Sequence, residues 1–366
     1  MSDDEVLWER QPHTAAKHEM LRRYLGAWFG IFGNHPRHRR VNIIDGFAGP
    51  GVYSGGEPGS PVIAVKTLLG HSGFASMNDT QFNFLFVEQR QDRVDHLERE
   101  LAALRGPAWP VNVGVSVERG NFFEVGQQLL DAMPDGRSLA PTFFFIDPFG
   151  YKDVPLSLIR QLLAYGGCEL FFYFDFNSVN RFGTSGVVDE AFEAYFGTTE
   201  FRDAPPAGDP DRAAYFHDLF ERQLRQECNL SYLQSFRMQN AKGKTGYYLF
   251  FGTRNLVAFD KMKQAMWTVD PSGQYQFSDQ FANQDVLFGA ELDTEPLRRA
   301  LLAEFAGRTV DIQEVTDWTV ANTPFAGNHV KTATLKPMEL EGVILAEGKP
   351  ARRRGTYADG TRITFP

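Results

Sequence analysis

A glycine-rich segment, Asp45-Gly-Phe-Ala-Gly-Pro-Gly51, follows the apolar run of residues 41–44. Glycines let a backbone approach a ligand closely and adopt positive φ angles. The D-x-F-x-G-x-G spacing is close to the first motif of methyltransferases and differs from the G-x-G-x-x-G of dinucleotide-binding enzymes. An ordinary glycine-rich turn is the structural alternative. We expect the amino-acid half of S-adenosylmethionine to rest on Asp45, Gly46, Phe47, Ala48, Gly49 and Gly51.

Two further apolar runs end in residues that suit a nucleoside. Glu88 ends the run 82–87, and an acidic residue there can accept hydrogen bonds from both ribose hydroxyls. Asn121 and Phe122 follow the run 113–117, where an amide can meet the adenine amino group and a phenyl ring can pack on the base. A solvated carboxylate and a Gly-Asn turn are the alternatives. The prediction is a nucleoside site built from Glu88, Asn121 and Phe122.

The segment Asp147-Pro-Phe-Gly-Tyr151 follows a fourth apolar run, 142–146. It resembles the D-P-P-Y tetrad of amino-group methyltransferases, in which the first side chain and the proline carbonyl bind the target amine and the aromatic residue stacks on the base. The sequence departs from that tetrad, because Phe149 replaces the second proline and Gly150 occupies the aromatic position. We expect Tyr151 to supply the stacking on the base one position later. A plain strand-to-loop turn is the alternative. The candidate catalytic residues are Asp147, Pro148, Phe149 and Tyr151.

Basic residues in three places could contact a phosphate backbone. Lys17 and Arg22 lie in a predicted helix, 14–33, Arg181 follows the fifth apolar run, and a basic turn precedes the last predicted strand. A solvated helix face, an Arg181–Asp175 pair and a solvated tail are the alternatives. The candidate nucleic-acid-binding residues are Lys17, Arg22, Arg181, Arg352, Arg353 and Arg354.

These residues need a sheet that brings strand ends together. The apolar runs lack polar alternation and are separated by helical patterns, which favours a doubly wound, mainly parallel sheet. Ligands bind beyond the carboxyl ends of such strands, where Asp45, Glu88, Asn121, Asp147 and Asn177 fall. Two late strands, 232–238 and 247–252, predict an antiparallel hairpin that closes the sheet, as is usual in methyltransferases. The expected class is α/β, with a Rossmann-like class I methyltransferase fold.

The chain is expected to divide into three parts. Residues 1–40 form an N-terminal helical segment, residues 41–290 a methyltransferase-like domain with a helical insertion at about 183–230, and residues 291–366 a small C-terminal domain. Two short helices and a strand pair with a basic tip indicate that the last part is winged-helix-like.

Composition limits the function classes. The net charge of −9 excludes a wholly basic nucleic-acid coat but leaves room for a local basic patch. The cysteines, Cys168 and Cys228, either form one disulfide or are free thiols in a reducing cytosol. No zinc-type Cys/His spacing, signal peptide or membrane-length apolar run occurs. We expect a cytoplasmic protein without a metal.

Several segments together resemble the three-Cys-motif partner proteins (TcmP). They are His13-Thr14-Ala-Ala-Lys17, the loop 45–51, Gly59-Ser60-Pro61, Phe145-Ile-Asp147-Pro-Phe-Gly150 and Arg353-Arg-Gly-Thr-Tyr357. The resemblance covers most of the chain and is weakest at 183–230. It implies a class I methyltransferase fold and a partner, a three-cysteine-motif protein similar to the phage Gp37/Gp68 family. It also implies a role in bacterial or phage nucleic-acid modification or repair.

Two functional hypotheses follow. In the first, the protein binds S-adenosylmethionine and methylates a base amine of nucleic acid, DNA rather than RNA, mainly by positioning donor and acceptor. In the second, it is a non-catalytic, nucleic-acid-binding partner of the three-cysteine enzyme. A nuclease has little support, since no carboxylate–carboxylate–lysine cluster has suitable spacing.

Overall fold

The computed structural model describes residues 6–133, 138–182, 189–281, 292–348 and 353–366. The chain forms two compact units. The first unit consists of Met1–Asn255 with Phe277–Asn283, and the second of Leu256–Gln276 with Gln284–Pro366. Arg352 lies outside the described residues.

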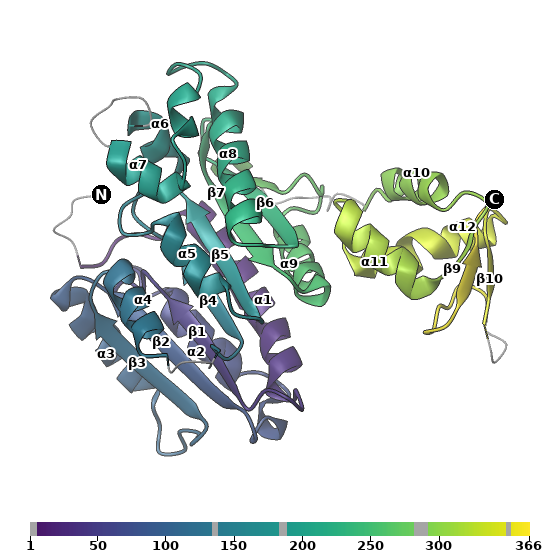
Figure 1. Ribbon diagram of the computed structural model, residues 1–366. Coiled ribbons are helices and arrows are strands. Elements are labelled where there is room, and N and C mark those ends of the chain that lie inside the picture. Colours follow the sequence, from purple (N-terminus) through teal and green to yellow (C-terminus); the bar gives the residue numbers. More distant parts are fainter. Residues whose placement is uncertain (1–5, 134–137, 183–188, 282–291, 349–352) are drawn as a thin grey trace. The chain divides into compact units, whose positions relative to one another are not determined.

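A mainly parallel sheet is the framework of the first unit (Figure 1). Its strand order is β3-β2-β1-β4-β5-β7-β6-β8. Strands β1 to β5 pair in parallel with one another, whereas β7 is antiparallel to both β5 and β6. This confirms the expected α/β sheet with an antiparallel hairpin. The strands are β1 (Arg40–Asp45), β2 (Gln81–Glu88), β3 (Val113–Arg119), β4 (Thr142–Ile146), β5 (Cys168–Phe174), β6 (Tyr232–Gln239), β7 (Thr245–Thr253) and β8 (Gln276–Ser278).

Helices cover both faces of this sheet (Figure 1). Because successive strand side chains point to opposite faces, Phe143 packs against Tyr24 of α1, whereas Phe172 and Phe174 join a core with α5, α7 and α8. The helices are α1 (Pro12–Gly33), α2 (Ser60–Leu69), α3 (Gln91–Leu104), α4 (Phe122–Asp131), α5 (Leu156–Leu163), α6 (Phe176–Phe182), α7 (Asp189–Phe196) and α8 (Arg212–Glu227).

The N-terminal helix α1 belongs to the first unit. Its apolar residues recur at helical spacing, and Tyr24, Leu25, Trp28 and Phe29 are at most 1% exposed. The helix packs on α2 and on aromatic residues of β2 and β4. The expected separate segment of residues 1–40 is thus one of the layers that cover the sheet. The expected helical insertion also forms part of a layer that covers the sheet, because Phe192, Phe196 and Phe216 are buried in the common core.

The second unit combines helices with a small antiparallel sheet of strand order β10-β11-β9. Along the chain its elements are α9 (Leu256–Val269), α10 (Glu295–Glu304), β9 (Thr309–Asp311), α11 (Ile312–Asn322), a π-helical turn (Val330–Leu335), α12 (Lys336–Leu340), β10 (Leu345–Glu347) and β11 (Arg362–Thr364). Strand β9 was not predicted, because three residues carry no readable alternation.

The second unit begins earlier than the expected residue 291. Helix α9 packs within it: Lys263 Nζ donates to the Val320 carbonyl at 2.8 Å and Trp267 Nε1 to the Pro324 carbonyl at 3.0 Å. These contacts join residues far apart in sequence, and no change of composition marks the boundary before α9. The sequence therefore could not place it.

Both Cys168 and Cys228 are buried and free, and burial raises the pKa of each thiol to about 12. Within the described ranges, no group of three His, Cys, Asp or Glu side chains is placed to hold a metal ion. None of the described helices has both the length and the apolar character needed to cross a bilayer.

Candidate functional site

The glycine-rich loop follows β1 and is hydrogen-bonded to the ends of two neighbouring strands. Gly46 donates to the Phe145 carbonyl of β4 and Ala48 to the Val87 carbonyl of β2, each at 2.9 Å. Gly51 has a φ of 87°, and a Cβ there would lie 2.8 Å from Leu97 Cδ1 of α3. Only glycine satisfies both constraints, which explains why the loop needs this residue type at position 51.

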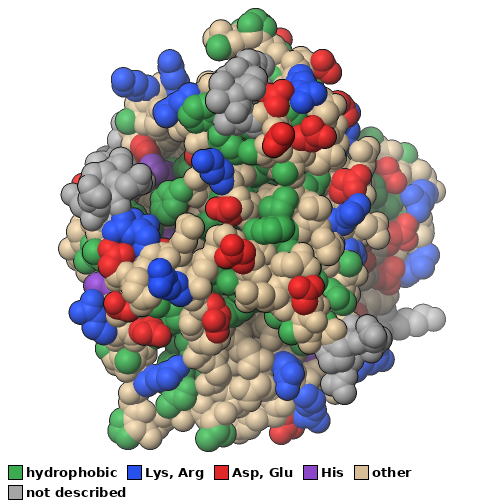
Figure 2. All heavy atoms as spheres, turned by 60° about the vertical axis from the view of Figure 1, so that its left-hand side comes forward, with side chains coloured by type: hydrophobic (Ala, Val, Ile, Leu, Met, Phe, Trp, Pro, Cys, Tyr) green, Lys and Arg blue, Asp and Glu red, His purple; other side chains and the backbone are tan. Residues whose placement is uncertain are grey.

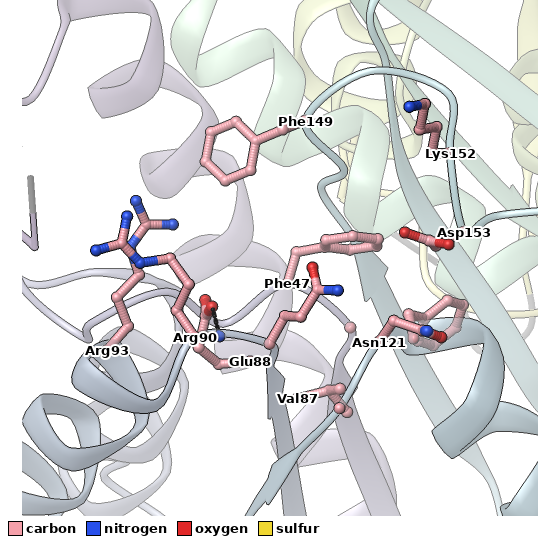
Figure 3. A pocket seen from close by; sticks show the side chains of 13 residues that line it. Phe47, Val87, Glu88, Arg90, Arg93, Asn121, Phe149, Lys152 and Asp153 are labelled. Carbon is pink, nitrogen blue, oxygen red and sulfur yellow. Dashed lines mark hydrogen bonds between the residues drawn. The ribbon is translucent and has the colours of Figure 1, made fainter. Parts of the chain in front are cut away.

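A cavity of about 290 Å³ opens beyond the carboxyl ends of β1, β2 and β3 (Figure 3). Phe47 and Phe149 face it, with Arg90 and Arg93 on one side and Asn121 on the other. It brings together six of the predicted site residues: Gly46, Phe47, Glu88, Asn121, Phe122 and Phe149. Asp45, Ala48, Gly49, Gly51, Asp147, Pro148 and Tyr151 do not line it.

One carboxylate oxygen of Glu88 accepts a hydrogen bond from the backbone. Its Oε1 accepts from the Arg90 backbone N–H at 2.8 Å, and the residue is 8% exposed. That bond fixes the rotamer and leaves Oε2 as an acceptor beside the cavity. The arrangement suits a ligand that presents hydroxyl donors.

Asn121 and Phe122 begin helix α4. Asn121 Oδ1 accepts from the Glu124 N–H at 2.8 Å, so this side chain caps the helix. The cap uses the amide oxygen, and the amide nitrogen stays available as a donor. Phe122 is 2% exposed, and a Cβ on Gly46 would meet its ring at 2.6 Å. The ring therefore forms the floor of the cavity beneath the loop.

Asp45 lies under the loop. It is 3% exposed, and its Oδ1 accepts from the Phe47 N–H at 3.1 Å. Burial raises the pKa of this carboxyl to about 7, while the nearby Ser60 hydroxyl and the Phe47 N–H oppose the shift. Its direct role is to hold the start of the loop.

Lys17 corrects an expectation. The residue is predicted to contact phosphate, but the structure buries its side chain, which is only 7% exposed. Its ammonium forms an ion pair with Asp147 instead. The ammonium also lies 5.2 Å from the Tyr173 ring centroid. Helix α1 thus places a buried cation beside the candidate catalytic carboxylate. Sequence reasoning missed this because the two residues are 130 positions apart.

The segment after Asp147 divides between surface and core. Phe149 is 65% exposed at the cavity, whereas Pro148 is buried. Tyr151 is 7% exposed and packs on Phe192, with ring centroids 4.5 Å apart. Its predicted stacking on a base is therefore wrong in this structure, because the ring is part of the apolar core.

The other predicted phosphate contacts are dispersed. Arg22 is exposed and pairs with Glu19 at 2.7 Å; Arg181 is exposed beside Phe182. In the second unit Arg353 is exposed. Arg354 donates to the Glu339 and Leu340 carbonyls at 2.5 and 3.3 Å, so it satisfies the carboxyl end of α12.

Sequence reasoning missed several residues around the cavity. Trp8 lies against Gly49, makes an edge contact with Phe149 at 6.0 Å and stacks under the Arg93 guanidinium at 4.7 Å. A lone tryptophan in a polar N-terminal stretch was the only available signal. The further lining residues are Arg90, Arg93, Lys152 and Asp153.

Neither a protein-family model nor a curated protein matches the sequence. Among solved structures, Trm1 from Pyrococcus horikoshii with S-adenosyl-L-methionine is 9% identical with a TM-score of 0.40, over 100% of this chain and 94% of that chain. A DUF574 family protein from Streptomyces avermitilis is 14% identical (TM-score 0.35; 66% and 84% covered). The plantazolicin methyltransferase BamL, solved with SAH, is 9% identical (TM-score 0.34; 66% and 86% covered).

At these identities and TM-scores, the similarities do not indicate the activity of this protein. The strand order and the site define the class by themselves. A sheet whose first seven strands have the order 3-2-1-4-5-7-6, with β7 antiparallel and the short β8 beside β6, and a glycine-rich loop after β1 form a Rossmann-like α/β fold of the methyltransferase type.

Proposed function

We propose that this protein binds S-adenosylmethionine and transfers its methyl group to a base amine of nucleic acid. One observation carries the proposal: Glu88, Asn121 and the loop after β1 converge on one cavity at the carboxyl edge of the sheet. Such cavities are where doubly wound folds bind nucleotides.

The residues present fit this cofactor. The loop at Gly46–Gly51 would hold its amino-acid half, Glu88 Oε2 would accept from the ribose hydroxyls, and Asn121 would meet the adenine edge above Phe122. The cofactor supplies the activated methyl group, and the protein supplies orientation.

Asp147 and Pro148 would orient the acceptor amine. In this arrangement the Asp147 carboxylate, held by the Lys17 ammonium, accepts a hydrogen bond from the amine through its second oxygen. The exposed ring of Phe149 offers a face for the target base, and an aromatic–base stack contributes about 1–3 kcal/mol.

The second unit supports a nucleic-acid target. Its order of helix, strand, two helices and two paired strands, from α10 to β11, is consistent with the proposed winged helix. Arg353 lies in the connection between β10 and β11, where a wing would contact phosphates. DNA as the target and a three-cysteine-motif protein as the partner remain parts of this proposal.

Titration with S-adenosylmethionine by calorimetry tests the cavity. Glu88→Ala should weaken binding about ten- to a hundredfold, because two hydrogen bonds to a charged acceptor are lost. Glu98→Ala, an exposed residue of α3, is the matched control and should bind like the parent. Equal affinity of the parent and the Glu88 variant, or no binding to any of them, would contradict the proposal.

A second function, that of a non-catalytic partner, is favoured by one observation. The tetrad lacks its aromatic residue, since Gly150 occupies that position and Tyr151 packs in the core. Methyl transfer from radiolabelled donor to single- and double-stranded DNA and RNA separates the two. Cofactor binding without transfer to any nucleic acid, together with stable complex formation with the three-cysteine protein, would support the partner.

A further inference from the structure

A second hollow lies at the opposite edge of the same sheet. It has a volume of about 1090 Å³ and opens at the amino ends of β1, β2 and β4. Arg37, Arg39 and Arg40 form its rim, and Asn42, Asn83 and Gln81 contribute to its wall. We call it the basic hollow. None of its residues lines the cavity beside Glu88.

One side of the basic hollow is a ladder of carboxamides, and Leu129, Met133, Leu139 and Pro141 also line the hollow. Asn42 stands in register with Asn83 of β2 and with Thr142 of β4. Asn83 Nδ2 donates to Asn42 Oδ1, and Asn42 Nδ2 to Thr142 Oγ1, each at 3.1 Å. Gln81 extends the row by donating to Asn83 Oδ1 at 3.4 Å.

This ladder keeps hydrogen-bonding capacity. Each amide nitrogen has two N–H groups and each amide oxygen two lone pairs, so the bonds within the row use only part of them. Asn42, Gln81 and Asn83 are half-buried, which places polar groups on strands that are otherwise apolar. Amides of this kind can pair with the edges of unpaired bases.

The rim supplies positive charge. Arg37, Arg39 and Arg40 are exposed. Arg39 pairs with Asp79 at 2.6 Å, but both side chains are largely exposed, at 65% and 83%, and such pairs contribute about 0–1 kcal/mol. His38 lies beside this rim, and burial with the charges of His35 and Arg37 lowers its pKa. The cationic character of the rim therefore comes from the arginines.

The chain as a whole is acidic, so positive charge has to be local to attract a polyanion. The chain carries a net charge of −9, and on the face drawn in Figure 2 Lys and Arg side chains are scattered among Asp and Glu side chains. Three neighbouring arginines thus place local positive charge beside the carboxamide ladder.

We propose that the basic hollow binds a nucleotide chain, with Arg37 and Arg40 on phosphates and the carboxamide ladder on base edges. The ligand is single-stranded, because base pairing would hide the edges that the ladder can meet. This inference does not rest on methyl transfer. A protein without cofactor affinity would still carry the site.

Fluorescence anisotropy with a labelled 12-nucleotide single strand tests it. The Arg37→Ala/Arg40→Ala variant should bind at least tenfold more weakly at low salt. The slope of log affinity against log salt should fall by about 1.4, as expected for two lost phosphate contacts. Arg160→Ala/Arg222→Ala, which removes two exposed arginines of α5 and α8, is the charge-matched control and should bind within twofold of the parent. Equal losses in both double variants would overturn the inference.

Two further binding measurements identify the ligand. Asn83→Ala should change the ratio of affinities for oligo-dA and oligo-dT severalfold while leaving the salt slope unchanged; an unchanged ratio would contradict base contact by the ladder. Competition by AMP at millimolar concentration would identify a free nucleotide as the ligand and overturn the chain-binding proposal. Calorimetric titration of the arginine variant with S-adenosylmethionine separates this site from the cofactor cavity, because its affinity should equal that of the parent.

Discussion

At the residue scale, two buried polar pairs connect α1 to the sheet. Lys17 pairs with Asp147, and Tyr24 donates to Glu169. Asp147 follows β4 and Glu169 lies in β5, both central strands of the sheet, and both partners come from a helix whose other buried residues are mostly apolar. Helix α1 therefore contributes specific electrostatics as well as packing.

The Lys17–Asp147 pair leads to a prediction about stability. Asp147→Ala leaves the Lys17 ammonium buried without its counter-charge and should lower the free energy of unfolding by about 3 kcal/mol. Lys17→Met/Asp147→Ala removes the stranded charge and should regain most of that loss. Urea unfolding of the single and double variants measures both values. A double variant no more stable than Asp147→Ala would show that the charge is not the cause.

Glu169 gives a pH dependence. Burial raises the pKa of its carboxyl to about 7 from 4.5, so the folded state retains a proton that the unfolded state releases in this interval. The free energy of unfolding should therefore fall as the pH rises from 4.5 to 7, by roughly 2–3 kcal/mol for this group. Glu169→Gln keeps an acceptor for Tyr24 and should show a flatter profile in urea unfolding from pH 5 to 8. Parallel profiles would contradict the assignment.

At the element scale, the loop after β1 depends on one close approach. Gly51→Ala combines a positive φ with a contact at 2.8 Å to the end of the Leu97 side chain, so the loop is strained and it or the Leu97 side chain must move. We expect S-adenosylmethionine to bind at least tenfold more weakly. Gly56→Ala is the matched control: its φ is 83° but nothing lies within 4 Å of an added Cβ, so it should cost about 1 kcal/mol of stability without changing affinity. Calorimetry and thermal unfolding compare them, and equal affinities would count against the loop.

At the scale of the whole molecule, the chain has two cores rather than one. Trp267 of α9 stacks on Phe325 with centroids 5.5 Å apart and donates to Pro324, all within the second unit. The covering layers of the first unit, by contrast, converge on the parallel sheet. Stability and cofactor affinity should therefore respond separately to changes in the two units.

Trp267→Ala tests this separation. It should destabilise the second unit by about 3–5 kcal/mol, as expected for a buried aromatic residue, and leave S-adenosylmethionine affinity within twofold of the parent. Differential scanning calorimetry should show one transition shifted and the other retained. A single transition that shifts as a whole would show that the units unfold together.

The sequence by itself determined the parallel sheet, its closing hairpin, the glycine-rich loop and the grouping of Glu88 with Asn121. Apolar runs, glycine spacing and the residues at strand ends are local, and local patterns report on elements directly. Tertiary structure alone decided that Lys17 neutralises Asp147, that Tyr151 packs in the core, that Trp8 lies against the loop and that α9 belongs to the second unit. The tertiary structure also forms the carboxamide ladder, because the register of three separate strands aligns Asn42, Asn83 and Thr142. These features join residues distant in the chain, and their contacts exist only once the layers have packed.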